Sequence, residues 1–468
     1  MRPALAAIFA TLPALALAAC ANDVALGGPT GLVRVDPEPA GANCPFGGVA
    51  VKTGLDKDGD NYLDDNEVTS VQYVCNGGEP VACAGGTVVS GTVNVASADD
   101  LAQLDTANCV DGNLLISGLD ADSLDHVDNL TIVTGSVVIA GNANLASLSA
   151  LQLAQVGGDY VIQSNDALAD LQGVGALQRA NSLRIIGNDA LTDLGGLDAF
   201  TDVVFPISVT NNASLASLSG LDHLATLAAT LVVDSNPKLA SVDALAQLRS
   251  VKQLDLSSNA TLAAVTLSAL ASVDVRVEIS DNAALASVSL PALASTGDFV
   301  RMDGDGALAS IALPSLVTTG GLYVENDPSI TSIAAPKLVF ATGVLSLTSD
   351  PHLAQLALGA LTSVGGDLTI YNLPAANLSG LSALGFVGGD FVLQNTTTLH
   401  DFTGLDALTS VAGSMTVKAN AQLRAFTGLA NMASVGGDLT ISSNPMLPAS
   451  AAQSFADGIT VHGAVTIN

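Results

Sequence analysis

The chain has 468 residues, of which 49 % are hydrophobic, but only 3 % are aromatic and none is Trp. Its 44 acidic and 14 basic residues give a formal net charge of −30, which repels nucleic-acid phosphates and anionic lipid heads. We therefore expect no nucleic-acid partner. Beyond the N-terminus no apolar run reaches the roughly 18 residues of a membrane helix, so we expect membrane contact through a lipid anchor alone.

The N-terminus has the parts of a secretory signal peptide, because a short basic start leads into an apolar stretch over residues 1–16. The sequence Leu-Ala-Ala-Cys that ends at Cys20 resembles the bacterial lipobox. That resemblance implies removal of residues 1–19 and lipidation of Cys20. The alternative is an ordinary cleavage site followed by an incidental cysteine. Ala21 favours export to the outer membrane or cell surface, and residues 20–43, rich in Gly, Pro and Ala, are predicted to form a flexible tether.

Four further cysteines lie beyond the tether, namely Cys44, Cys75, Cys83 and Cys109. An even number of cysteines in an exported chain indicates disulfides. Of the possible pairings we favour Cys44–Cys75 and Cys83–Cys109, because each pair then brackets one unit. The alternatives are free thiols or a zinc site, and no Cys-x-x-Cys motif or nearby His supports zinc.

The first bracketed unit, residues 44–78, contains an acidic stretch with the spacing of an EF-hand calcium loop. Calcium prefers a cage of oxygen ligands, and this spacing supplies them around a tight turn. The predicted ligands are Asp56, Asp58, Asp60, the carbonyl of Tyr62, Asp64 through water, and a bidentate Glu67. Strand-like flanks replace the paired helices of a sensor, which favours a structural calcium site over a switch. The alternative is a solvated acidic turn.

The unit also resembles a small Cys-bracketed module of bacterial surface lipoproteins. Residues 79–111 are predicted to form an N-terminal cap on the region that begins at residue 112, with a short helix starting at Ser97 or Asp99. At the other end, residues 448–455 are expected to form a short helix. The last residues, 465–468, are expected to form a strand with an open edge, which allows self-association.

Residues 112–468 repeat with a period of about 23 residues, which indicates a solenoid. The pattern is Gly-Gly-Asp-Leu-x-Ile-x-x-Asn-x-x-Leu-x-x-Leu. Two apolar residues flank an outward one, as in Leu254-Asp255-Leu256. The Asn after each strand is expected to adopt a left-handed turn and to stack as a hydrogen-bonded ladder. Asp occupies the same slot at Asp305, Asp327 and Asp350, whereas Asn372 and Asn395 fall one position early.

The stretch from Leu248 to Leu262 fits the leucine-rich-repeat template, and the Gly-Gly-Asp turns with Asn-x-x-Leu make the segment resemble the receptor L-domain variety. The resemblance covers about three quarters of the chain. It implies a mainly β fold, a right-handed β-solenoid of leucine-rich-like repeats. The alternative, an alternating βα sheet, needs longer helical stretches than the Gly-rich gaps allow.

The outward row of the strands is the best place for recognition. Most of its residues are small and neutral. The mid-stack group Asp255, Glu278, Arg301 and Tyr323 combines charges with an aromatic ring and is the predicted ligand-binding patch. The alternative is a set of ordinary solvated strand residues.

No HExxH, GxSxG or P-loop motif occurs, and the five His are scattered, so we expect no enzyme activity. Two hypotheses remain. The first is a lipid-anchored surface binding or adhesion protein that recognises a protein or glycan. The second is a structural envelope spacer or self-assembling element without a specific ligand. The only expected cofactor is structural calcium.

Overall fold

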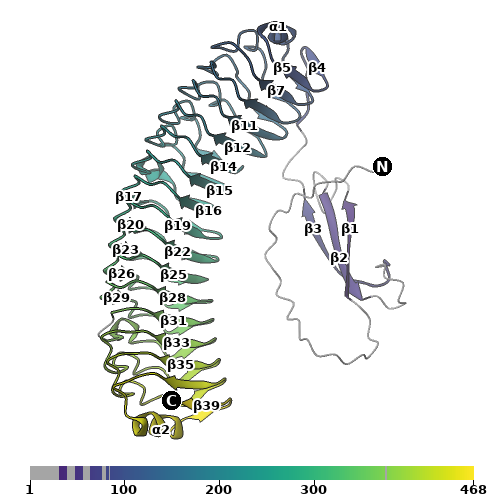
Figure 1. Cartoon of the computed structure of the whole chain (residues 1–468). Helices are drawn as coiled ribbons and strands as arrows, with labels where there is room; N and C mark the ends of the chain where they lie inside the picture. The colour runs from purple at the N-terminus through teal and green to yellow at the C-terminus, as the bar shows by residue number, and fades with distance from the viewer. Residues whose placement is uncertain (1–30, 39–47, 56–63, 76–80, 84, 375–376) are drawn as a thin grey trace. The chain divides into compact units, whose positions relative to one another are not determined.

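The computed structural model describes residues 31–38, 48–55, 64–75, 81–83, 85–374 and 377–468. The chain divides into two compact units, Met1–Pro80 and Val81–Asn468 (Figure 1). No helix in the described ranges is long and apolar enough to cross a membrane.

The first unit contains a three-stranded antiparallel sheet in the order β1-β2-β3. Its strands are β1 (Gly31–Glu38), β2 (Gly48–Leu55) and β3 (Val68–Cys75). The strand-like flanks expected on both sides of the acidic stretch are therefore present as β2 and β3. Strand β1 lies inside residues 20–43, the segment for which a flexible tether is predicted, and it pairs along its whole length with β2. The alternation of Leu32, Val33, Arg34 and Val35 supports a strand there despite the surrounding Gly and Pro.

The second unit is a parallel β-solenoid of about 16 turns with a spacing of roughly 23 residues, as the repeat predicts. One strand per turn builds the main sheet, and Figure 1 shows the solenoid bending toward it, with β5 and β39 at opposite ends. The main strands are β5 (Val93–Val95), β7 (Leu114–Ser117), β9 (Val137–Ala140), β11 (Asp159–Gln163), β12 (Ser182–Ile186), β14 (Ile207–Thr210), β15 (Thr226–Asp234), β16 (Ser250–Ser257), β19 (Val277–Ser280), β22 (Phe299–Asp303), β25 (Gly321–Glu325), β28 (Leu345–Thr348), β31 (Leu368–Tyr371), β33 (Phe391–Gln394), β35 (Met415–Lys418), β37 (Leu439–Ser442) and β39 (Val465–Ile467).

Shorter strands precede the main strands. They are β4 (Val88–Ser90), β6 (Cys109–Asp111), β8 (Ile132–Val133), β10 (Gln155–Val156), β13 (Asp202–Val203), β18 (Ser272–Val273), β21 (Ser295–Thr296), β24 (Thr318–Thr319), β27 (Phe340–Ala341), β30 (Ser363–Val364), β32 (Phe386–Val387), β34 (Ser410–Val411), β36 (Ser434–Val435) and β38 (Thr460–Val461). A third row on the other side holds β17 (Ala264–Thr266), β20 (Ser287–Ser289), β23 (Ser310–Ala312), β26 (Ser332–Ala334) and β29 (Gln355–Ala357). Short 3₁₀ turns are η1 (Ala102–Leu104), η2 (Asp243–Gln247) and η3 (Ser379–Leu381).

The period-two pattern decides which side chains enter the core. In β16, Leu254 and Leu256 are fully buried, whereas Asp255 lies on the outer face of the sheet. The same alternation recurs in the other turns, so that one continuous aliphatic core runs along the solenoid. Tyr160 occupies one inward position in place of an aliphatic residue and is fully buried.

The turn Asn residues form the expected buried ladder. The backbone N–H of Asn142 donates to Oδ1 of Asn165 over 3.2 Å, and Nδ2 of Asn165 donates to the carbonyl of Ile139 over 3.0 Å. The expectation that these Asn residues adopt the left-handed conformation is wrong. The residue before each of them does so, as at Asn211 with φ 59° ahead of Asn212.

This placement explains Asn372 and Asn395. Both occupy the left-handed position, with φ 55° and 57°, so the ladder slots of their turns hold Leu373 and Thr396. Thr396 continues the ladder, because its backbone N–H and its hydroxyl both donate to Oδ1 of Asn420. Leu373 has no polar group on its side chain and interrupts it.

A second ladder explains the Gly-Gly-Asp turns. Oδ1 of Asp367 accepts the N–H of Asp390 over 2.8 Å, and Oδ1 of Asp390 accepts the N–H of Ser414 over 2.7 Å. A Cβ on Gly389 would meet Oδ1 of Asp367, and a Cβ on Gly413 would meet Oδ1 of Asp390. Gly is therefore required where the carboxylate of the preceding turn approaches the backbone.

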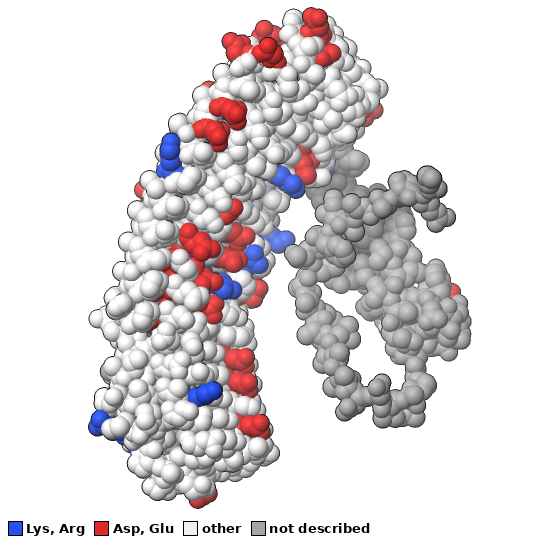
Figure 2. Space-filling model, viewed as in Figure 1, with Lys and Arg blue, Asp and Glu red and all other residues white. Residues whose placement is uncertain are grey.

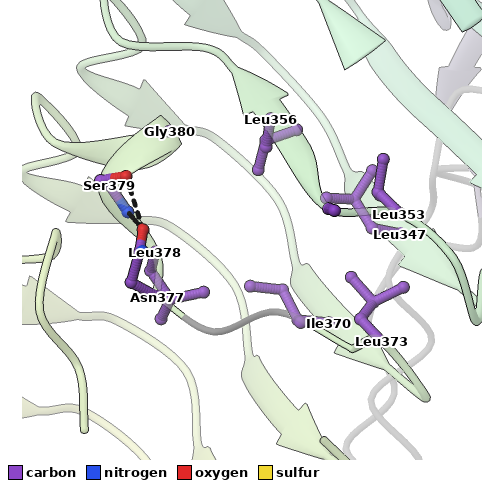
Figure 3. A pocket seen from close by; sticks show the side chains of 10 residues that line it. Leu347, Leu353, Leu356, Ile370, Leu373, Asn377, Leu378, Ser379 and Gly380 are labelled. Atoms are coloured by element: carbon purple, nitrogen blue, oxygen red, sulfur yellow. Dashed lines mark hydrogen bonds between the residues drawn. The ribbon is translucent and has the colours of Figure 1, made fainter. Parts of the chain in front are cut away.

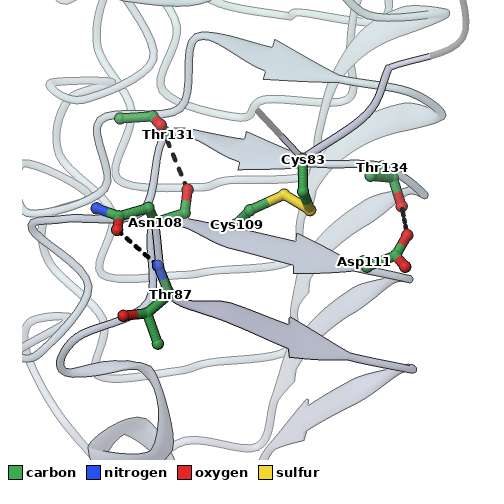
Figure 4. Close-up of a disulfide and its surroundings, with 7 residues drawn as sticks. All are labelled: Cys83, Thr87, Asn108, Cys109, Asp111, Thr131 and Thr134. Atoms are coloured by element: carbon green, nitrogen blue, oxygen red, sulfur yellow. Dashed lines mark hydrogen bonds between the residues drawn. A yellow bond between two sulfur atoms is a disulfide. The ribbon is translucent and has the colours of Figure 1, made fainter. Parts of the chain in front are cut away.

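The two ends of the solenoid differ. At the N-terminal end the predicted disulfide Cys83–Cys109 is present and joins the segment before β4 to β6 (Figure 4). Helix α1 (Ala98–Leu101) begins after Ser97, whose backbone N–H donates to the Asp100 carboxylate over 2.9 Å. At the C-terminal end, α2 (Ala449–Asp457) places Phe455 flat against Phe426, with 4.1 Å between ring centroids.

Candidate functional site

The four residues predicted to form the ligand-binding patch lie side by side on the outer face of the main sheet. Asp255 on β16 pairs in register with Glu278 on β19, Glu278 with Arg301 on β22, and Arg301 with Tyr323 on β25. The parallel register places equivalent positions of successive turns in one row. The structure therefore brings all four together at the middle of the solenoid.

Each of two arginines in this region contacts two carboxylates. Nε of Arg276 lies 3.1 Å from Oε2 of Glu278 and 3.6 Å from Oδ1 of Asp255. Nη2 of Arg301 lies 2.7 Å from Oδ2 of Asp303 and 3.0 Å from Oε2 of Glu325. Both arginine side chains are one-third exposed, at 34 %.

The two arginines and their carboxylate partners form an acidic cluster. Its four carboxylates (Asp255, Glu278, Asp303 and Glu325) outnumber its two guanidinium groups, which leaves a charge of −2. Burial opposes the charge of Arg301, but the hydrogen bond and negative charge of Asp303, together with Glu325 and Glu278, raise the pKa of Arg301. The carboxylates are held in place as well. Oε1 of Glu325 accepts the hydroxyl of Ser346 over 2.7 Å, and Oδ2 of Asp255 accepts Nε2 of Gln253 over 2.8 Å.

Two aromatic rings complete the patch. Phe299 and Tyr323 meet edge to face, with 5.6 Å between centroids and 79° between planes. The guanidinium of Arg276 lies 5.5 Å from the Phe299 ring centroid, and that of Arg301 lies 5.9 Å from the Tyr323 centroid. Burial and the negative charges of Asp298 and Glu325 raise the pKa of the Tyr323 hydroxyl, so it stays protonated at neutral pH. We call these eight residues the mid-stack patch, namely Asp255, Arg276, Glu278, Phe299, Arg301, Asp303, Tyr323 and Glu325.

Four of the eight residues of the mid-stack patch were not predicted from the sequence, namely Arg276, Phe299, Asp303 and Glu325. Each lies two residues before or after the predicted row, which is the same face of the sheet by the period of two. A search of the outward positions one step either side of that row would have found them. Figure 2 shows acidic and basic side chains lying together midway along the visible face of the solenoid, and a further group of acidic side chains at its upper end.

The predicted calcium loop is described only in part. Asp56, Asp58, Asp60 and Tyr62 lie outside the described residues. Glu67 is buried, its Oε2 accepts the N–H of Asp64 over 3.1 Å, and its own N–H donates to the carbonyl of Asp64 over 3.0 Å. The last positions of the loop thus form a closed turn with the Glu67 carboxylate folded back over it.

The other predicted site residues in the first unit are cysteines. Cys20 and Cys44 lie outside the described residues, while Cys75 ends β3. Within the described ranges, no group of three or more His, Cys, Asp or Glu side chains is arranged to hold a metal ion.

A small apolar cavity of about 50 Å³ lies where Leu373 interrupts the Asn ladder (Figure 3). Leu347, Leu356, Ile370 and Leu373 line it, and polar atoms come from Asn377 and Ser379. This volume has room for a few water-sized groups at most, so it is a packing defect rather than a ligand pocket.

Comparison with known proteins adds one match. Residues 31–75 match the model of a domain of unknown function, DUF7151. The matched range spans the three strands of the first unit and includes β1. No curated protein matches the chain.

Proposed function

We propose that the chain is a lipid-anchored surface recognition protein whose mid-stack patch binds a basic segment of a partner protein. The observation that carries the proposal is the pairing of two arginines with four carboxylates on an open strand face. Each arginine holds its carboxylates in a fixed arrangement, and the surplus of negative charge is available to a cationic partner. The half-buried aromatic pair of Phe299 and Tyr323 offers an apolar contact beside these charges.

A titration with defined peptides tests this proposal. The probes are a short fluorescent oligolysine peptide and an oligoglutamate peptide of the same length, at physiological salt. The double variant E278Q/E325Q is expected to weaken oligolysine binding by about 2- to 30-fold, since two partly exposed charge pairs are lost.

The control variant is D390N/D438N, which removes the same charge from distant turns of the same sheet. Asn keeps the Oδ1 acceptor that these two residues provide to the next turn. Equal weakening in both variants would mean that oligolysine responds to net charge and not to the mid-stack patch.

A glycan is the second candidate ligand, and the edge-to-face pair of Phe299 and Tyr323 favours it, because sugar rings stack on aromatic faces beside carboxylates. Binding of a neutral glycan that is lost in Y323A but retained in E278Q/E325Q would support the glycan over the basic partner.

The anchor and the first unit belong to the same proposal. Lipidation of Cys20 would hold the chain at the outer membrane or cell surface, and C20S is expected to release it into the soluble exported fraction. A structural calcium ion would be bound by Asp56, Asp58, Asp60, Tyr62, Asp64 and Glu67. A Cys44–Cys75 disulfide would join the segment ahead of β2 to the end of β3.

The alternative is a structural envelope element that associates through β39. Val465 on this strand is 48 % exposed. Concentration-dependent assembly in sedimentation, abolished by a charged residue in V465K, would favour that alternative over ligand recognition.

A further inference from the structure

Three consecutive turns carry Asp instead of Asn in the buried ladder. Asp305, Asp327 and Asp350 have no exposed surface. Oδ1 of Asp305 accepts the backbone N–H of Asn282 over 2.7 Å, Oδ1 of Asp327 accepts that of Asp305 over 2.8 Å, and Oδ1 of Asp350 accepts that of Asp327 over 3.0 Å. One oxygen of each carboxyl group therefore acts as the Asn oxygen does in neighbouring turns.

The second carboxyl oxygen, Oδ2, differs from the group that an Asn places at the same position. In the Asn turns this position holds Nδ2, which donates to a backbone carbonyl of the preceding turn, as from Asn282 to Leu256 over 3.1 Å. Oδ2 of each Asp is buried and has no hydrogen-bond partner among the described residues. An ionised oxygen there would face acceptors, whereas a protonated one would be a donor like the amide.

The register identifies those acceptors. Leu256 pairs with Ile279, Ile279 with Met302, and Met302 with Val324. The carbonyl of Leu256 accepts from Asn282, and the carbonyls of Ile279, Met302 and Val324 occupy the equivalent positions for Asp305, Asp327 and Asp350. A neutral carboxylic acid has the shape and the hydrogen-bonding pattern of an Asn side chain in this slot.

We propose that Asp305, Asp327 and Asp350 form a proton-linked joint: they complete the ladder as neutral acids, and loss of their protons at alkaline pH loosens the turns that carry the mid-stack patch. Arg301 and Asp303 lie on the strand that precedes Asp305, and Tyr323 and Glu325 lie on the strand that precedes Asp327. The joint and the patch thus share these two turns.

The charged groups around the joint reinforce proton retention. Burial raises the pKa of Asp305 to about 7, opposed by the bonds from Asn282 and helped by the charges of Asp281 and Asp303. Burial raises the pKa of Asp327 to about 8, with Asp305, Asp350 and Asp303 adding to it. Burial likewise raises the pKa of Asp350 to about 7, with Glu325 and Asp303 adding to it. The guanidinium of Arg301, on the strand that precedes Asp305, is already paired with Asp303 and Glu325.

The sign of the pH effect follows from linkage. An Asp in the unfolded chain releases its proton near pH 4, whereas these three keep theirs up to about pH 7 to 8 when folded. The folded state therefore binds more protons between these values. The stability that the joint contributes is fully present below about pH 4 and is lost as the pH rises through about 7 to 8.

Infrared spectroscopy of the full chain tests the joint directly. At pH 6 the wild type is expected to show the carbonyl stretch of protonated carboxylic acid, which disappears by about pH 9. The variant D305N/D327N/D350N is expected to lack that band at pH 6. The absence of the band in the wild type, or its persistence in the variant, would overturn the proposal.

Stability gives the second readout. The melting temperature of the wild type is expected to fall between pH 6 and pH 9, and that of the triple Asn variant is expected to fall less and to be higher at pH 9. The control D128N/D166N/D189N makes the same three Asp-to-Asn changes at exposed positions, so that its net charge equals that of the joint variant at pH 9, and its melting temperature is expected to follow that of the wild type. Equal pH dependence in the wild type and the joint variant would overturn the proposal.

Hydrogen exchange on the wild type gives a readout that does not depend on any variant. Protection of the amides of Asn282 and Asp305 is expected to fall at least about tenfold from pH 6 to pH 9, relative to the amides of Asn165 and Asn188 in the Asn part of the ladder. Parallel behaviour of the two sets would contradict a joint at the middle turns.

Discussion

Replacing Asn212 with Leu is expected to break the buried ladder at one turn. Oδ1 of Asn212 accepts the N–H of Asn188 over 3.0 Å, and its Nδ2 donates to the carbonyl of Ile185 over 3.1 Å. A Leu side chain leaves both backbone groups without these partners inside the core. Each such group costs about 1–3 kcal/mol, so N212L is expected to lower the free energy of unfolding by about 2–6 kcal/mol.

Equilibrium unfolding in urea, followed by circular dichroism, measures this loss. The control Q163L introduces the same Leu at an exposed position of β11 and is expected to change the free energy of unfolding by less than about 0.5 kcal/mol. Hydrogen exchange should place the lost protection at the amide of Asn188 and its neighbouring turns, because each turn of a solenoid contacts mainly the next. A loss in N212L no larger than in Q163L would refute the structural role of the ladder.

Three further predictions concern the core, the disulfide and the calcium loop. Y160F is expected to raise the free energy of unfolding by about 1 kcal/mol in the same urea assay, because the Tyr160 hydroxyl is buried without a partner among the described residues. C83S/C109S opens a disulfide with a sequence separation of 26 residues and is expected to lower it by about 3–4 kcal/mol relative to the oxidised wild type. Calcium is expected to raise the melting temperature and to bind in calorimetry, and D58N is expected to abolish both effects; equal calcium binding by D58N would remove the loop assignment.

The strands and the core of the solenoid could be predicted from the sequence because the repeat places apolar residues at fixed inward positions in every turn. The Asn ladder could be predicted for the same reason. Its interruption could not, because Asn372 and Asn395 differ from the ladder residues by one position, and only the backbone shows that this position is left-handed. A shift of one residue in a turn changes the role of a side chain completely.

Strand β1 was not predicted either, because the Gly-, Pro- and Ala-rich composition around it is typical of a tether. Only half of the residues of the mid-stack patch could be predicted from the sequence. The row that contains Arg301 and Tyr323 stands out by residue type, whereas the pairing of Arg276 with Asp255 and Glu278 joins neighbouring turns and depends on the register. The ladder formed by the Asp residues of the Gly-Gly-Asp turns was not predicted, because the motif alone does not indicate that each Asp carboxylate accepts a backbone hydrogen bond from the next turn.

The central claim, that the carboxylates of the mid-stack patch bind a basic partner, is tested most directly by removing the arginine that neutralises two of them. R301A frees Asp303 and Glu325 and is expected to tighten binding of the oligolysine peptide relative to K418A, which removes the same charge from β35. Weaker oligolysine binding by R301A than by K418A would contradict the account and would assign Arg301 itself to the ligand.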